Sequence, residues 1–495
     1  MKMMKKIKQI IIIKKLNKMK IKNVFGIIIL LNILHSCVIP PYTQKSENRK
    51  TPEVYILSKN NNDTTNSANI SWKEFFKDTT LNNLISIALQ NNQELNIFLQ
   101  EINIAQNNVR FRKAQYLPYI GAILGSGLEK PAKYTFNGAV EEQLNITDDK
   151  KFPDPLPDIL LGANISWEID IWKKLRNSKK AAVYKYLSTI QGKNYLVTRL
   201  VTEVASLYYE LLSLDNQLEI TQNYIDILIN ALEIVKQEKV AARTTELAVK
   251  RFEAEVLKNQ SKIYYIKQQI VETENKLNFL LGRFPQPIPR NPKIFPDMNL
   301  LQVQSGIPSQ LLRNRPDIKE AELQLMATRL EIKSAKAEFY PSLKLDGVLG
   351  WQAFSGNYLF KTPESLLWEI VGEFITPLVN RNALKANYFS AIAEQNKTAY
   401  IYEQRVINAY SEVANQQANI INLENAYNLK KQQVEALTQS VDISINLFKN
   451  ARADYMEVLL TQRDALEAKY ELIETKKQQM QAAINLYRAL GGGWK

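Results

Sequence analysis

The sequence predicts a mainly α-helical chain that also carries membrane β-strands and is built from one structural unit written twice. Three observations support this prediction: long proline-free segments with heptad spacing, pairs of short strand-like segments, and blocks of the chain that align with one another without gaps. The expected unit is a helix, a β-hairpin and a long helix. With 495 residues, 45% of them hydrophobic and 23% charged, the chain has the composition of a folded protein.

The first 36 residues have the pattern of a lipoprotein signal peptide. A lysine-rich start precedes an apolar core at 24–34, which is too short to span a membrane. The segment Leu34-His35-Ser36-Cys37 resembles the lipobox of bacterial lipoproteins. This resemblance implies cleavage before Cys37 and lipidation of its thiol.

Two further features flank this signal. Because Met19 would begin a signal of ordinary length, we hypothesise that residues 1–18 are an upstream extension from a misassigned start codon. Residues 37–70 are largely polar and lack periodicity, and we expect them to form a lipidated tether or an extended arm.

The positive charge is concentrated in the signal. Of the formal net charge of +14, nine lysines precede Cys37 with no acidic residue among them, which leaves 14 − 9 = +5. Such a mixed balance is typical of a solvated surface and argues against a nucleic-acid partner.

Cysteine and histidine are nearly absent. The only cysteine is Cys37 and the only histidine is His35. These counts exclude an intrachain disulfide, a Cys/His metal cluster and a histidine-based catalytic triad. The chain also lacks a phosphate-binding glycine-rich loop. We therefore expect no catalytic residue, no metal site and no cofactor, and we predict that the chain is not an enzyme.

The duplication appears as two constant offsets. At an offset of 223, residues 91–95 match 314–318 and residues 114–118 match 337–341. At an offset of 209, the matching pairs are Leu175-Arg176 with Leu384-Lys385, Glu203-Val204-Ala205 with Glu412-Val413-Ala414, Ala242-Arg243 with Ala451-Arg452, and Leu281-Gly282 with Leu490-Gly491. An ungapped register of this length indicates repeats. We place the first repeat at 71–290 and the second at 291–495.

The first repeat opens with a helix expected over 81–116, which ends before Pro118 because proline forces the preceding residue out of the α region. A β-hairpin is expected near 119–169, with a Pro-, Asp- and Asn-rich loop at Lys130–Asp158 that should face water. A long helix then runs from about Leu175 to Ala241, long enough for roughly 100 Å.

The second repeat follows the same order. Pro341 ends its first helix, a β-hairpin is expected near 342–376, and the glycines Gly491-Gly492-Gly493 are predicted to end the last helix as a C-cap. In the first repeat, the long helix carries a coiled-coil stripe that only Thr221 interrupts. The stripe consists of Val204, Leu207, Leu211, Leu214, Leu218, Ile225, Leu228, Leu232 and Val235.

The strand count predicts oligomerisation. Two hairpins leave open edges, and an open sheet in a bilayer has unpaired backbone groups. Closed membrane barrels start at about eight strands. We therefore expect several chains to supply the missing strands, and three chains would give 3 × 4 = 12.

Several sequence strings resemble the TolC and OprM-type outer-membrane factor family, in particular its lipoprotein branch. The strings are Trp72-x-x-Phe75-Phe76-x-Asp78, Leu81-x-x-Leu84-Ile85, Ile165-Ser166-Trp167-Glu168-Ile169-Asp170, Ile307-Pro308-Ser309-x-Leu311-Leu312 with Arg315-Pro316-Asp317, and Leu486-Tyr487-Arg488-Ala489-Leu490-Gly491-Gly492-Gly493-Trp494. Together they follow the family's order from Cys37 to the C-terminus.

This resemblance implies a homotrimer with a 12-strand barrel in the bacterial outer membrane over a 12-helix barrel in the periplasm. It would act as the passive exit duct of a tripartite efflux system, with a periplasmic adaptor (membrane fusion) protein and an inner-membrane pump of the resistance-nodulation-division type. The alternatives are a periplasmic coiled-coil structural lipoprotein and the exit duct of a type I protein secretion system. The sequence does not distinguish drug, metal, peptide or protein cargo.

The resemblance also assigns the breaks in the long helices, Ala242–Glu246 and Ala451–Glu457, to periplasmic tips. The predicted aperture residues are Glu457, Leu460, Asp454 and Arg452, and the predicted adaptor contacts are Arg243, Thr244, Thr245 and Ala453. The family frequently has an acidic residue where this chain has Leu460, which puts cation selectivity in doubt. We expect the second hairpin to gate and the first to pack.

Simpler roles exist for several of these residues. Glu457 is either an aperture residue or a solvated carboxylate favoured near a helix N-terminus. Arg243 and Arg452 either bind a neighbour or cap helix ends, and Asp454 is expected to be an N-cap. Trp167 and Trp368 belong either to an interfacial aromatic belt or to the core where helix meets strand.

Overall fold

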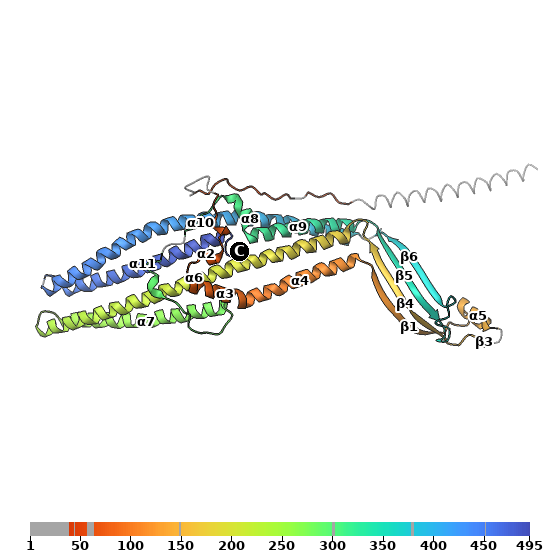
Figure 1. Cartoon of the computed structure of the whole chain (residues 1–495), viewed down its shortest axis with the longest axis horizontal. Helices are drawn as coiled ribbons and strands as arrows, with labels where there is room; N and C mark the ends of the chain where they lie inside the picture. Colours follow the sequence, from red (N-terminus) through yellow and green to blue (C-terminus); the bar gives the residue numbers. More distant parts are fainter. Residues whose placement is uncertain are drawn as a thin grey trace, which may run out of the picture. The chain divides into compact units, whose positions relative to one another are not determined.

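The computed structural model describes residues 39–43, 45–56, 64–147, 150–298, 302–377, 381–450 and 452–495. The predicted signal peptide and Cys37 lie outside these residues. The chain is mainly helical, as predicted (Figure 1). The helices are α2 (Trp72–Phe75), α3 (Thr79–Asn91), α4 (Gln93–Tyr116), α5 (Phe136–Gln143), α6 (Lys174–Val240), α7 (Glu246–Leu280), α8 (Leu311–Asn314), α9 (Pro316–Ala337), α10 (Asn382–Lys449) and α11 (Tyr455–Ala489). The strands are β1 (Tyr119–Glu129), β2 (Asn145–Thr147), β3 (Lys150–Lys151), β4 (Leu156–Ile169), β5 (Ser342–Ala353) and β6 (Leu366–Ile375).

The described residues form two compact units, and each unit takes segments from both repeats. The strand unit contains the described residues before 47 together with Ala105–Tyr186 and Gln324–Ala399. The tip unit contains Glu47–Ile104, Leu187–Leu323 and Tyr400–Lys495. Across the described residues, no helix is both long enough and apolar enough to cross a membrane.

The strand unit is built on one antiparallel sheet with the order β1-β4-β5-β6 (Figure 1). Tyr119 pairs with Ser166 between β1 and β4, and Ser342 pairs with Ile375 between β5 and β6. Both predicted hairpins are therefore confirmed, and the β4–β5 ladder joins them. The loop of the first hairpin, predicted to face water, is largely exposed and contains α5 and the small β2–β3 ladder.

Proline marks both junctions between helix and strand, as predicted. Pro118 separates α4 from β1, and Pro341 separates α9 from β5. The two tryptophans with alternative predicted roles differ from each other. Trp167 is partly buried and its indole N–H donates to the carbonyl of Tyr116 at 3.1 Å, so it anchors the junction. Trp368 is 69% exposed on β6.

In the tip unit, most of the heptad stripe of α6 is buried, and Leu207 and Leu218 are partly buried. Val204, Leu211 and Leu228 are each 0% exposed. Thr221, which interrupts the stripe, is also buried because its hydroxyl donates to the carbonyl of Gln217 at 2.7 Å. The stripe therefore contains a buried polar residue whose hydroxyl is hydrogen-bonded.

The N-terminal strings pack against the end of the last helix. The ring of Phe75 stacks on Tyr487, with centroids 4.0 Å apart. Asp78 accepts the N–H of Thr80 at 2.8 Å and so caps α3, and it also accepts the hydroxyl of Tyr208 at 2.9 Å. Residues from the beginning, middle and end of the chain therefore share one core.

The single opening helix predicted over 81–116 is wrong, because the chain forms α3 and α4 with a break at Asn92. The Asn92 carboxamide oxygen accepts the N–H of Leu95 at 2.9 Å, and its amide donates to the carbonyl of Leu280 at 3.0 Å. Asparagine side chains compete in this way with helical backbone bonds. The sequence did contain a signal for this break: at the offset of 223, Gln93 at the start of α4 matches Pro316, which begins α9 in the second repeat.

The described residues 39–43 and 45–56 form an arm without helix or strand. In the strand unit, the N–H of Lys45 donates to the side-chain oxygen of Asn396 at 3.2 Å. In the tip unit, Tyr55 is 2% exposed and stacks on Tyr410 with centroids 5.5 Å apart. The arm is therefore anchored on α10 by specific contacts.

Candidate functional site

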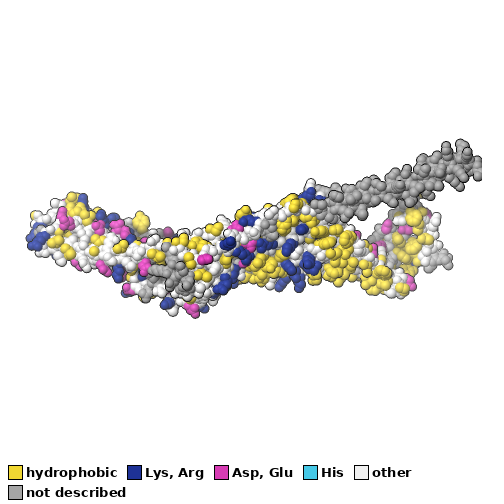
Figure 2. Space-filling view, turned by 90° about the horizontal axis from the view of Figure 1, so that it is seen from above, with side chains coloured by type: hydrophobic (Ala, Val, Ile, Leu, Met, Phe, Trp, Pro, Cys, Tyr) yellow, Lys and Arg dark blue, Asp and Glu magenta, His cyan; other side chains and the backbone are white. Residues whose placement is uncertain are grey.

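One face of the four-stranded sheet is apolar from edge to edge. Residues in register across neighbouring strands share a face. Three such rows are Ile120, Ile165, Gly347 and Ile370; Ala122, Ala163, Leu349 and Trp368; and Leu124, Leu161, Trp351 and Leu366. Figure 2 shows hydrophobic side chains gathered on this part of the surface. Leu124 is 81% exposed and Ile370 is 69% exposed, although both are strongly apolar.

The opposite face of the same sheet is mixed. It carries glycines and the polar residues Asn164, Asp346 and Glu369. Alternation between an apolar and a polar face is typical of membrane β-strands whose one side meets lipid and whose other side meets water. The sheet can therefore contact lipid on one side only.

The two helical hairpins of the tip unit, α6–α7 and α10–α11, turn in the same way. At the first tip, the N–H of Arg243 donates to the carbonyl of Glu238 at 2.8 Å; at the second, the N–H of Arg452 donates to the carbonyl of Leu447 at 2.9 Å. Both pairs are related by the offset of 209. A bond that reaches back five positions is the signature of a Schellman helix end, and Ala242 has the expected positive φ of 56°.

Charged groups at the first tip are paired with one another. The guanidinium of Arg243 lies 3.7 Å from the Glu238 carboxylate, and Lys239 forms an ion pair with Glu246. The hydrogen bond from Lys239 lowers the pKa of the Glu246 carboxyl. Of the other predicted adaptor contacts here, Thr245 is exposed and Thr244 is partly buried. Thr245 precedes α7 without a side-chain capping bond.

Charged groups at the second tip are exposed and lack such pairing. Within the described ranges, neither Arg452 nor Asp454 nor Glu457 has an ion-pair partner within 4.0 Å, and all three are exposed. Leu460 is 39% exposed and lies three positions after Glu457, on a neighbouring part of the same helix face. Ala453 is partly buried.

The predicted N-cap at the second tip is right in position only. Asp454 directly precedes α11 with extended backbone, but its carboxylate makes no capping hydrogen bond. It therefore remains available to another partner. Ala451, the first residue of the predicted second tip, lies outside the described residues.

An apolar cluster joins the two hairpins behind the tips. It includes Leu228 of α6, Phe252 of α7 and Leu466 of α11. Near the tips, the guanidinium of Arg251 donates to the sulfur of Met456 at 3.4 Å, linking α7 with α11. The sequence analysis did not identify this contact, because nothing in the spacing of these two residues indicates it.

At the other end of these hairpins, Arg315 forms a buried ion cluster that the sequence did not reveal. It is 4% exposed, donates to the carbonyl of Ala489 at 2.9 Å, and contacts Asp317 at 2.7 Å and Glu412 at 2.6 Å. Burial acts to lower the pKa of the Arg315 guanidinium, but the two carboxylates outweigh burial and hold its pKa above the ordinary value. The cluster ties α9, α10 and the end of α11 together.

Comparisons with known proteins agree with this geometry. A family model described as outer membrane efflux protein matches residues 84–283 and 307–492. The cation efflux system protein CusC of Escherichia coli O6:H1 is 26% identical over 93% of this chain and 97% of its own length. The solvent efflux pump outer membrane protein SrpC of Pseudomonas putida is 27% identical over 85% of this chain and 87% of its own.

A solved structure shares the fold. The MtrE outer membrane channel of Neisseria gonorrhoeae, in its open state, superimposes with a TM-score of 0.79 at 22% identity, covering 92% of this chain and 98% of that one. The family match extends over both repeats and most of the chain. The chain therefore belongs to the outer membrane efflux protein family, as an outer-membrane efflux channel and not an enzyme.

Proposed function

We propose that three copies of this chain form one exit duct, with a 12-strand barrel in the outer membrane and a 12-helix barrel in the periplasm. The observation that carries the proposal is the apolar sheet face that ends in two open edges. In the described chain, β1 and β6 each pair on one side only. Open edges in lipid leave backbone groups unsatisfied, and three chains would close them with 3 × 4 = 12 strands.

The helices support the same count. Each chain contributes the four arms of its two hairpins, α6, α7, α10 and α11, so three chains contribute 3 × 4 = 12. Aromatic side chains on α7 are also exposed: Tyr264 and Tyr265 are each 72% exposed and Phe279 is 76% exposed. Contact with a neighbouring chain would bury them.

The test of the barrel is a charge placed on either face of β6. Ile370→Lys puts an ammonium on the apolar face, at an expected cost of about 2–4 kcal/mol per chain near the bilayer centre. Glu369→Lys, on the opposite face, is the matched control. We expect light scattering in detergent to give a trimer for wild type and Glu369→Lys and to show loss of trimer for Ile370→Lys. A monomeric wild type that forms no channel in planar bilayers would contradict the proposal.

The tips have different proposed roles. The second tip, with Arg452, Asp454, Glu457 and Leu460, is proposed to form the closing aperture, because its exposed charges have no ion-pair partners among the described residues. The first tip is proposed to pack and, through Arg243, Thr244 and Thr245, to contact a periplasmic adaptor, together with Ala453 of the second tip. Its own charges are already paired, which suits a fixed element.

The proposed partners are a periplasmic adaptor protein and an inner-membrane pump of the resistance-nodulation-division type. Relatives named for cation efflux and for solvent efflux both match along most of this chain, so related channels serve cargo of different chemistry. We assign no cargo, and secretion of proteins by a type I system is the alternative. Co-purification of an adaptor with wild type but not with an Arg243→Ser, Thr244→Ala chain would support the first-tip contact. Equal recovery with both would contradict it.

Cys37 is proposed to carry the lipid anchor. The anchored arm over residues 45–56 supports this, because it holds the start of the mature chain against α10. We expect mass spectrometry of the mature protein to show an acylated N-terminal Cys37. A Cys37→Ser chain that matures with an unchanged N-terminal mass would contradict lipidation.

A further inference from the structure

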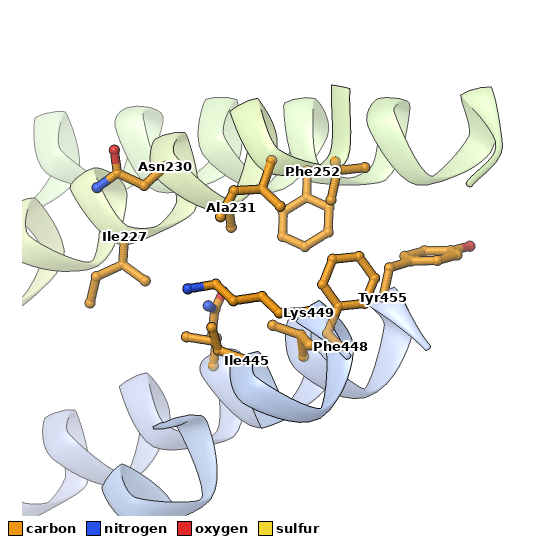
Figure 3. A pocket seen from close by; sticks show the side chains of 12 residues that line it. Ile227, Asn230, Ala231, Phe252, Ile445, Phe448, Lys449 and Tyr455 are labelled. Atoms are coloured by element: carbon orange, nitrogen blue, oxygen red, sulfur yellow. The ribbon is translucent and has the colours of Figure 1, made fainter. Parts of the chain in front are cut away.

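We propose that the tip unit contains a binding site for a small uncharged aromatic amide, located between its two helical hairpins. A cavity of about 150 Å³ lies among α6, α7, α10 and α11 (Figure 3). Its walls come from all four helices, including Val235, Phe252, Phe448 and Gln462. Cavities of this size with apolar walls accept a single aromatic ring.

The walls favour a ring. Phe252 of α7, which is 1% exposed, faces Phe448 and Tyr455 of the other hairpin across the gap (Figure 3). Ile227 and Ala231 of α6 complete the wall beside Phe252. Aromatic walls at this spacing allow edge or offset contacts with a bound ring.

Gln462 supplies the second, independent observation. Its side chain lines the cavity and is 2% exposed, yet neither its amide nitrogen nor its amide oxygen has a hydrogen-bond partner in the described part of the chain. Native proteins rarely leave a buried amide unpaired, because the unmade hydrogen bonds carry a desolvation cost. An occupant that pairs both atoms would remove that cost.

The chemistry of the occupant follows from this amide. A carboxamide presents one donor and one acceptor side by side and so complements both free atoms of Gln462. The only charged side chain among the described lining residues is Lys449, which is exposed. A cationic occupant would meet no carboxylate among these lining residues, and an anionic one could pair only with this exposed ammonium, which water already solvates. An uncharged aromatic amide fits both the apolar walls and the glutamine.

The site also connects the two hairpins. Because the walls come from the first hairpin (α6–α7) and the second (α10–α11), an occupant would contact both. The proposal concerns binding alone and does not depend on the proposed trimer or on conduction.

The test uses the full mature chain in lipid nanodiscs and measures binding of para-fluorobenzamide and para-fluorotoluene by fluorine NMR, with empty nanodiscs as the baseline. Gln462→Met keeps the length of the side chain but removes the amide. Ala231→Phe fills the cavity and keeps the amide. Gln478→Leu, an exposed glutamine in the same helix, is the matched control.

We expect Gln462→Met to weaken binding of the amide about 3- to 10-fold, the ratio that one or two neutral hydrogen bonds supply. The same variant should bind para-fluorotoluene at least as tightly as wild type, which shows that the cavity is intact. Ala231→Phe should abolish binding of both probes, and Gln478→Leu should change neither. If wild type binds no more than Ala231→Phe, the cavity holds only water and the proposal is wrong. It is also wrong if Gln462→Met binds the amide as wild type does, or if it loses both probes alike.

Discussion

The two repeats share one backbone joint but hold it with different chemistry. This joint is the contact between the end of the hairpin's second helix, α7 or α11, and the break in the repeat's opening helix. In each repeat that second helix ends at a glycine with positive φ, Gly282 at 66° and Gly491 at 90°. A Cβ at Gly282 would lie 2.3 Å from the carbonyl oxygen of Asn91, and one at Gly491 would lie 2.6 Å from that of Asn314. Asn91 and Asn314 are themselves related by the offset of 223. The close contact of helix end and helix break is thus duplicated.

The next residue differs between the repeats. In the first, Asn92 donates to the carbonyl of Leu280; in the second, Arg315 at the same place donates to the carbonyl of Ala489. Arg315 additionally binds Asp317 and, from α10, Glu412. The two joints have the same backbone geometry, but a neutral amide holds the first and an ion cluster holds the second, so only the second joint depends on charge.

The largest expected effect is at this second joint. Arg315→Met leaves the carboxylate of Asp317, which is 2% exposed, without its main partner, and Arg405 at 3.8 Å replaces it only in part. We expect the free energy of unfolding to fall by about 3–5 kcal/mol. Asn92→Ala should cost about 1–2 kcal/mol. Denaturant unfolding of both variants measures the difference, and equal losses would contradict the comparison.

The joint illustrates what a single sequence can predict. The repeat offsets, Pro118, Pro341 and the α6 stripe were sufficient for the order of helices and hairpins, because each follows from local spacing. The break at Asn92 and the contact between Arg315 and Glu412 were missed. Both depend on side chains that meet partners 188 and 97 positions away, which periodicity does not reveal. For the same reason, the buried Gln462 looked like any polar residue of an amphipathic helix.

A smaller effect is expected at the two glycines. Alanine at Gly282 or Gly491 places a Cβ against a backbone carbonyl and requires a positive φ, so each variant should lose about 1–3 kcal/mol of unfolding free energy. Gly356→Ala is the control, since nothing lies within 4 Å of its Cβ. Thermal unfolding of the three variants tests whether the joint is duplicated. Tolerance of alanine at only one of the two joint glycines would show that the two joints are packed differently.

The smallest effect is a dependence of stability on pH at Glu320, a position whose counterpart in the first repeat has no ionisable group. Burial raises the pKa of the Glu320 carboxyl, with Arg405 opposing and Asp317 reinforcing the shift. Its counterpart at the offset of 223 is Ile97, which cannot ionise. A raised folded-state pKa means that the stability contributed by protonated Glu320 is present at low pH and lost as the pH rises through that pKa.

Glu320→Gln should therefore be more stable than wild type at neutral pH, and the gain should vanish as the pH falls below the ordinary pKa of the carboxyl. Unfolding midpoints measured over this pH range provide the test. A gain that grows toward acid would have the wrong sign.

The most direct test of the difference between the repeats is single-channel conductance of matched tip variants in planar bilayers. Arg452→Ser with Glu457→Gln removes one positive and one negative charge from the second tip, and Arg243→Ser with Glu246→Gln removes one of each from the first tip. If the second hairpin gates and the first only packs, the second-tip variant should conduct several-fold better than wild type and the first-tip variant should match it. Equal conductance of the two variants, or a larger change at the first tip, would contradict the account.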